Sequence, residues 1–140
     1  MSATQGSATR ATSVRDFVQL KVLGEGTYGK VLLVKHKKTQ KYYAMKMLKK
    51  KKLRQLNQVE HTKSERRILE LMRHPVIVQR KFSFQSTDKL YFVLNYCQGG
   101  ELFFYLCNLR RFKVEFASFY AANILLALKY LHENNIIYRE

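Results

Sequence analysis

Residues 24–31 read GEGTYGKV and match a G-x-G-x-x-G-x-V pattern, which is typical of a loop that holds phosphate groups. A polyphosphate needs backbone N–H groups at close range, and glycine allows this because no Cβ stands in the way. Dinucleotide-binding folds place similar glycines at the start of a helix, but here residues 31–34 read VLLV and continue as a strand. The pattern therefore excludes a dinucleotide-binding turn and leaves a phosphate-binding hairpin or an ordinary glycine-rich hairpin.

The sequence around this loop predicts an α+β fold that begins with a five-stranded antiparallel sheet. Alternating apolar residues predict strands, and apolar residues at helical spacing predict helices. The expected strands start at Phe17 and at Val31 and cover residues 42–48, 76–84 and 90–95. The expected helices cover residues 59–73, a short segment from Glu101, and residues 115–133, and Pro75 ends the first of them.

Two charged residues follow the glycine loop in an order that suits phosphate binding. Alternation places Ala44 and Lys46 on one face of the third strand, where alanine leaves room for an adenine ring and lysine reaches phosphate oxygens. Glu65, on the next helix, can hold such a lysine in place. A single strand lysine or helical glutamate more often faces solvent. The order of glycine loop, A-x-K and helical glutamate favours a nucleotide site.

Several further motifs resemble one family. Residues 43–46 (YAMK), 82–85 (FSFQ), 90–94 (LYFVL), 99–103 (GGELF) and 138–139 (YR) resemble the AGC group of serine/threonine protein kinases. Within that group the chain is most similar to the protein kinase B and serum/glucocorticoid-regulated kinase families. The resemblance implies a flexible leader at 1–16, a kinase N-lobe at 17–97, and the hinge end with the first helices of an incomplete C-lobe at 98–140.

The resemblance implies an ATP site and names its residues. Gly24, Gly26 and Gly29 would lie over the phosphates, and Lys46 would contact the α- and β-phosphates while paired with Glu65. The remaining positions would be Val31 and Ala44 around the adenine, Leu94 as gatekeeper, Asn95 and Cys97 in the hinge, and Glu101 at the ribose. Glu101 would also bind a basic residue upstream of the phosphorylated Ser or Thr, so the expected partners are basic protein substrates.

The family's catalytic loop begins where this sequence stops. In that loop an Asp accepts the proton of the substrate hydroxyl, and an Asn and a later Asp hold magnesium. Residues 138–140 read YRE, so Glu140 stands at the position of the catalytic base and is one methylene longer. Magnesium ligands are expected only in a complete parent protein, and the chain as given is not expected to transfer phosphate.

Composition leaves two alternatives to a truncated kinase. The formal net charge of +16 would suit nucleic acid or an anionic lipid surface as a partner. However, the basic residues are dispersed along the chain, apart from a cluster at residues 49–52 and Arg54. This cluster indicates the solvated start of a helix. The alternatives are a non-catalytic, pseudokinase-like interaction module and a basic nucleic-acid- or lipid-binding fragment, with nucleic acid disfavoured. We expect no transmembrane segment, because polar residues interrupt residues 116–131. We expect a cytoplasmic protein, with a nuclear location left open.

Two features predict unfavourable burial of a charge and exposure of apolar surface. Alternation over residues 76–84 places Arg80 among apolar side chains, so we expect a local bulge, a carboxylate partner or instability. The helix at 115–133 carries apolar residues that a complete C-lobe would cover, so we expect exposure and self-association.

Overall fold

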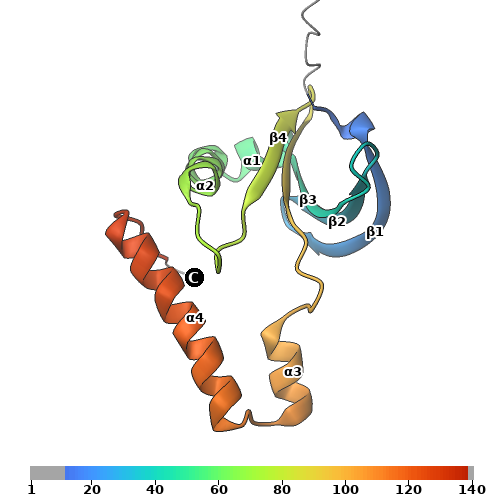
Figure 1. The fold of residues 1–140 in the computed structure, drawn as a ribbon. Coiled ribbons are helices and arrows are strands. Elements are labelled where there is room, and N and C mark those ends of the chain that lie inside the picture. The colour runs from blue at the N-terminus through green and yellow to red at the C-terminus, as the bar shows by residue number, and fades with distance from the viewer. Residues whose placement is uncertain (1–11, 139–140) are drawn as a thin grey trace, which may run out of the picture.

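A computed structural model describes residues 12–138, which form one antiparallel sheet followed by helices that extend away from it (Figure 1). The elements in chain order are the 3-10 helix η1 (Val14–Asp16), β1 (Phe17–Gly26), β2 (Gly29–His36), β3 (Tyr42–Lys49), α1 (Lys50–Gln55), α2 (Val59–Leu71), β4 (Arg80–Gln85), β5 (Lys89–Asn95), α3 (Leu102–Leu109) and α4 (Val114–Glu133).

The sheet has five strands in the order β1-β2-β3-β5-β4, and each neighbouring pair is antiparallel. The predicted five-stranded α+β fold is therefore confirmed. The main difference lies before β4, which begins at Arg80 instead of Val76. Residues after Pro75 form a turn in which the Ile77 N–H donates to the His74 carbonyl at 3.1 Å. The alternation of apolar residues therefore predicted a strand over residues 76–84, but residues 76–79 precede the strand that forms.

The two faces of the sheet bury different sets of side chains. Residues directly opposite each other on paired strands share a face. The larger core covers one face and consists of Phe17, Leu32, Val34, Met45, Met47, Tyr91 and Val93. On the opposite face Leu48 and Phe92 pack with Leu53 of α1. Lys46 pairs with Phe92 and therefore lies on this second face, on the same side as α1.

Arg80 avoids burial as an unpaired charge through a bulge and a carboxylate partner, two of the three outcomes that the sequence predicted. A register shift between Arg80 and Phe82 forms a bulge, which places Arg80 opposite Leu94 and away from the apolar side of Phe82. Its guanidinium then meets a carboxylate, with Nη2 lying 3.1 Å from Glu70 Oε2 on α2. The predicted bulge and the predicted carboxylate partner are both confirmed, and Arg80 does not sit among the core side chains of β4.

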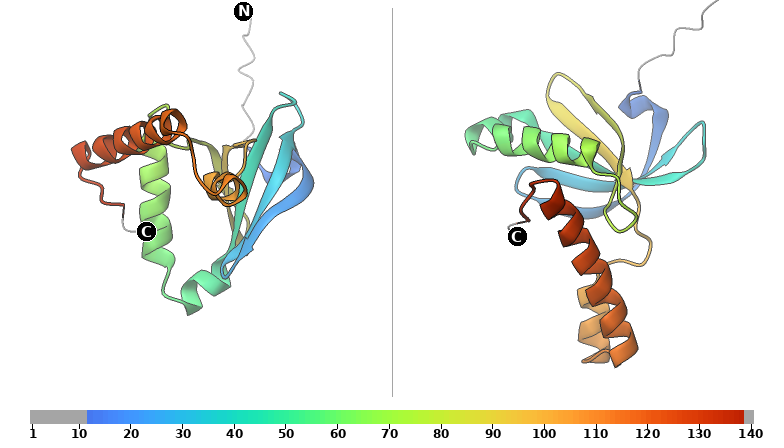
Figure 2. Two further views of the ribbon diagram at one scale, coloured as in Figure 1. Left: turned by 90° about the horizontal axis from the view of Figure 1, so that it is seen from below. Right: turned by 60° about the vertical axis from the view of Figure 1, so that its left-hand side comes forward.

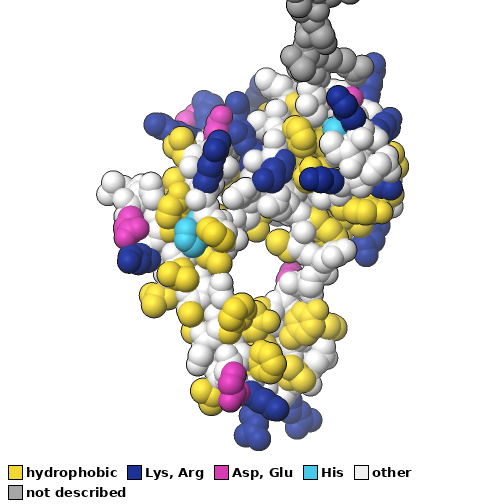
Figure 3. Space-filling view, in the orientation of Figure 1, with side chains coloured by type: hydrophobic (Ala, Val, Ile, Leu, Met, Phe, Trp, Pro, Cys, Tyr) yellow, Lys and Arg dark blue, Asp and Glu magenta, His cyan; other side chains and the backbone are white. Residues whose placement is uncertain are grey.

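Helices α3 and α4 have few neighbours among the described residues. They extend away from the sheet and diverge from the turn that joins them (Figures 1 and 2), and the C-terminal half of α4 meets the segment after α2. There the Arg73 N–H donates to the Tyr130 hydroxyl at 3.2 Å, and the rings of His74 and Tyr130 lie 4.9 Å apart. Much of the remaining apolar surface of both helices is exposed (Figure 3). Phe104, Phe116 and Phe119 are among these exposed side chains.

By length and apolar composition alone, α4 qualifies as a candidate membrane span, although the polar residues within it predicted no such segment. A buried core helix of a globular protein passes the same test, but α4 has no buried residue in this stretch, and one such helix is weak evidence. At the start of α4, the N-terminal cap residue Lys113 makes no side-chain hydrogen bond to the helix backbone, as expected for a lysine in place of Ser, Thr, Asp or Asn.

We expect the 140-residue chain to self-associate through the exposed apolar side chains of α3 and α4. Gel filtration with light scattering over a range of concentrations measures this. Replacing both Phe116 and Phe119 with Gln should reduce association, because these side chains are 57% and 62% exposed on one face of α4. Leu71→Gln on α2, where the side chain is 59% exposed, is the matched control. A monodisperse monomer at every concentration would contradict the prediction.

Candidate functional site

An ion pair joins the sheet to α2 at the centre of the predicted site. Lys46 lies on β3 and Glu65 lies on the second turn of α2, and Lys46 Nζ donates to Glu65 Oε1 at 2.6 Å. The two side chains are 32% and 39% exposed, so solvent reaches the pair from one side. A partly exposed pair adds little stability, but it fixes the direction of the ammonium group. The structure therefore brings together the two residues that the sequence paired.

A cavity of about 260 Å³ connects this lysine with the glycine hairpin. Its lining comes from the β1–β2 hairpin and β3 and consists of Gly24, Glu25, Gly26, Tyr28, Gly29, Lys30, Val31, Lys46 and Leu48. Five of the predicted site residues line this cavity: the three motif glycines, Val31 and Lys46. The side chains of Glu25, Tyr28, Lys30 and Leu48 were not predicted. Leu48 could have been found by extending the alternation of Ala44 and Lys46 by two residues.

The motif glycines meet two different requirements. Gly29 faces the backbone of β3, and a Cβ there would lie 1.8 Å from the Met47 carbonyl oxygen. Gly24 and Gly26 have no atom within 4 Å of such a Cβ, so open space adjoins them. Gly29 thus permits the hairpin to approach β3, while the other two leave room beside the loop. The Tyr28 carbonyl also accepts the Lys49 N–H at 2.9 Å, which ties the hairpin tip to β3.

Apart from Val31, the residues predicted around the adenine and the ribose lie outside that cavity's lining. Ala44 and Leu94 are directly paired across β3 and β5 and share the face of Lys46. The Asn95 N–H donates to the Gln79 carbonyl at 3.1 Å, so this hinge donor already has a partner. Cys97 is exposed, and Glu101 is exposed at the N-terminal cap of α3. The predicted binding roles of these residues stay predictions.

The family model for the protein kinase domain matches residues 17–140. The chain belongs to the protein kinase family. It is 45% identical over its whole length to the human RAC-beta serine/threonine-protein kinase, covering 29% of that protein. RAC-beta serine/threonine-protein kinase A of Xenopus laevis is 47% identical over 91% of this chain, which covers 26% of that relative. A Dictyostelium discoideum RAC family serine/threonine-protein kinase homolog is 45% identical over 97% of the chain, which covers 31% of it.

These relatives confirm the resemblance to AGC-type serine/threonine kinases. The kinase chain spans less than a third of the length of these relatives. Glu140, predicted at the position of the catalytic base, lies outside the described residues. Within residues 12–138, no three His, Cys, Asp or Glu side chains gather closely enough to hold a metal ion.

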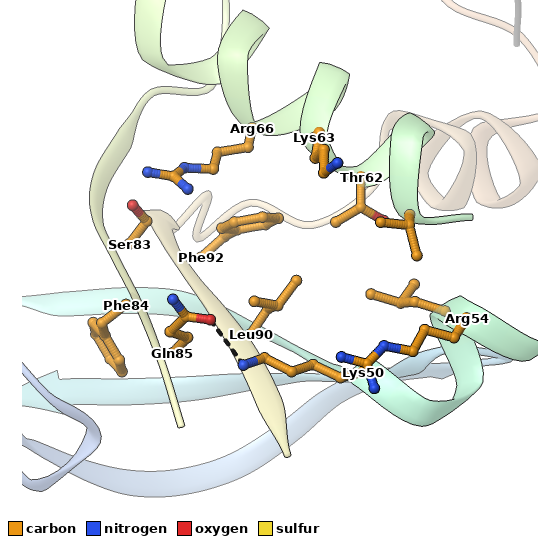
Figure 4. Close-up of a pocket in the computed structure, with 12 residues that line it drawn as sticks. Lys50, Arg54, Thr62, Lys63, Arg66, Ser83, Phe84, Gln85, Leu90 and Phe92 are labelled. Carbon is orange, nitrogen blue, oxygen red and sulfur yellow. Dashed lines mark hydrogen bonds between the residues drawn. The ribbon is translucent and has the colours of Figure 1, made fainter. Parts of the chain in front are cut away.

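A second, larger cavity of about 400 Å³ lies between α2 and the β4–β5 edge of the sheet (Figure 4). Apolar side chains of α1, α2 and β5 form its floor, and the cations around it are Lys50, Arg54, Lys63 and Arg66. Lys50 Nζ donates to Gln85 Oε1 at 2.8 Å and to the Ser86 carbonyl at 2.7 Å. No local sequence pattern indicated this cavity, because its lining comes from the four elements α1, α2, β4 and β5.

Proposed function

We propose that the cavity between the glycine hairpin and Lys46 binds the phosphate groups of ATP. The observation that carries the proposal is the 2.6 Å pair of Lys46 and Glu65, which lies beside a cavity lined by three glycines. Lys46 would donate to phosphate oxygens, and Glu65 would keep the ammonium group aimed at them. The backbone beside Gly24 and Gly26 is open, so phosphate oxygens can approach its N–H groups closely.

We further propose that the whole protein transfers the γ-phosphate of ATP to Ser or Thr hydroxyls of other proteins. When bound with magnesium, ATP supplies the phosphoryl group, and the described residues contribute binding and orientation. The described residues fit the phosphates, whereas they bring no cluster of carboxylates together for the magnesium ion. Glu101 is an exposed carboxylate at the start of α3 and would favour substrates that carry a basic residue before the phosphorylated position.

Calorimetric titration of ATP, with and without magnesium, tests the binding proposal. We expect saturable binding of one ATP per chain, and a flat titration under both conditions would contradict it. Transfer of labelled phosphate by the full-length protein tests the second step. Arginine-containing Ser peptides should be labelled, and the same peptides with Ser replaced by Ala should not.

The second cavity favours a second candidate function, that of a non-catalytic interaction module. Its apolar floor and cationic surroundings would suit a protein segment with apolar and acidic side chains. ATP binding by a full-length protein that labels no peptide would support this candidate. A basic nucleic-acid or lipid binder would instead lose affinity steeply as salt concentration rises.

A further inference from the structure

Helix α2 does not lie flush on the sheet. The second cavity lies between Thr62 and Arg66 of α2 and Phe92 and Ser83 of β5 and β4 (Figure 4). Two ion pairs nevertheless reach from the sheet to this helix, namely Lys46 with Glu65 and Arg80 with Glu70. Val59 packs against the core at the start of α2, and these two ion pairs tie the later turns of the helix to the sheet.

The contacts of Arg80 use both ends of its guanidinium group. Nη1 donates to Ser83 Oγ at 2.6 Å, and Nη2 lies 3.1 Å from Glu70 Oε2. The Arg80 side chain is only 11% exposed, whereas that of Glu70 is 55% exposed. A planar guanidinium with two partners has a defined orientation. Arg80 is thus a largely buried anchor on β4 for a carboxylate carried by α2.

The two ion pairs hold α2 at separate points. Glu70 follows Glu65 by five residues, which corresponds to about 7 Å along a helix axis. A helix tied at one point can still pivot about it, whereas a second tie restricts both tilt and rotation. An outward movement of α2 would also leave Arg80 largely buried without its carboxylate, which is unfavourable.

We propose that Arg80 is a positioning residue, whose ion pair with Glu70 holds α2 in the orientation that brings Glu65 to Lys46. The proposal rests on the ATP-binding function proposed above and adds a control on that site. Arg80 does not line the glycine-lined cavity, so its proposed effect on that cavity passes through α2. Leu94, its strand neighbour, is unchanged in a Glu70 variant, which therefore tests the route through α2.

Glu70→Gln in the full-length protein removes one charge with little change in shape. We expect faster hydrogen exchange of the α2 backbone amides and about two- to fivefold weaker ATP binding, since Glu70 is partly exposed. Glu60→Gln is the matched control. Glu60 pairs with Lys63 at 2.6 Å within the same helix, and its side chain is 78% exposed, so neither measurement should change. The charge-exchanged variant, Arg80→Glu with Glu70→Arg, should restore slow exchange and ATP affinity.

A mutant cycle separates positioning from general stabilisation. In a Glu65→Gln background, Glu70→Gln should cause no further loss of ATP affinity, because the pair that it positions is already broken. A residue that is merely structural would cause the same fold-loss in both backgrounds, and this result would overturn the proposal. Equal α2 exchange in Glu70→Gln and Glu60→Gln would also overturn it. If the unmodified protein binds no ATP, the proposed function fails, while α2 exchange in these variants still decides whether Arg80 holds the helix.

Discussion

Replacing Gly29 with alanine is expected to lower the free energy of unfolding by about 2–4 kcal/mol. The new Cβ would lie 1.8 Å from the Met47 carbonyl oxygen, and that atom belongs to the backbone of a paired strand. A flexible side chain could move away, but the β2–β3 ladder must separate to make room. Chemical denaturation followed by circular dichroism measures the change, and ATP titration should show a parallel loss.

Gly24→Ala is the matched control, because a Cβ at position 24 has no neighbour within 4 Å. It should change the free energy of unfolding by less than about 0.5 kcal/mol, as is usual for a substitution with no specific clash. Equal destabilisation by the two substitutions would show that the close approach of the hairpin to β3 does not determine the requirement for Gly29.

Lys46→Met is expected to weaken ATP binding by roughly tenfold to a hundredfold, the range of a lost hydrogen bond to a charged group. Methionine keeps the length of the side chain but removes its charge and its donors. The substitution also leaves Glu65 without its 2.6 Å partner beside the proposed phosphate site, which adds repulsion. Calorimetric titration measures the affinity, and a melting curve checks that the variant is folded.

Lys30→Met tests whether position or general charge attracts the nucleotide. Lys30 lines the same cavity and carries the same charge, but the glutamate of α2 pairs with Lys46 and not with Lys30. We expect a clearly smaller loss of affinity than for Lys46→Met. Equal losses would indicate that the positive potential of the cavity, and not the oriented ammonium group, binds the phosphates.

Local patterns were sufficient for the elements that form the site. Alternation predicted β3 as residues 42–48, and the strand observed is Tyr42–Lys49. The helix predicted at residues 59–73 is observed at Val59–Leu71, two residues shorter at its end. The Lys46–Glu65 pair was accessible from sequence because the order of the motifs, together with the family resemblance, connected residues that periodicity alone leaves separate.

Contacts between distant segments determined two features that sequence patterns did not predict, namely the environment of Arg80 and the second cavity. Arg80 was placed on the apolar face by alternation, whereas the bulge opposite β5 moves it to the face of Leu94, where α2 supplies Glu70. A bulge depends on pairing with another strand, so it leaves no mark in the alternation of β4 itself. The second cavity was missed for the same reason, since α1, α2, β4 and β5 each contribute part of its lining.

The sequence by itself determined the order of the elements, the glycine hairpin and the residues available to hold phosphate, because periodicity and motif spacing are properties of neighbouring residues. The tertiary structure alone decided the fit of Gly29 against β3, the partner of Arg80 and the separation between α2 and the sheet. These features arise when distant segments meet, and their geometry is set by strand register and helix position.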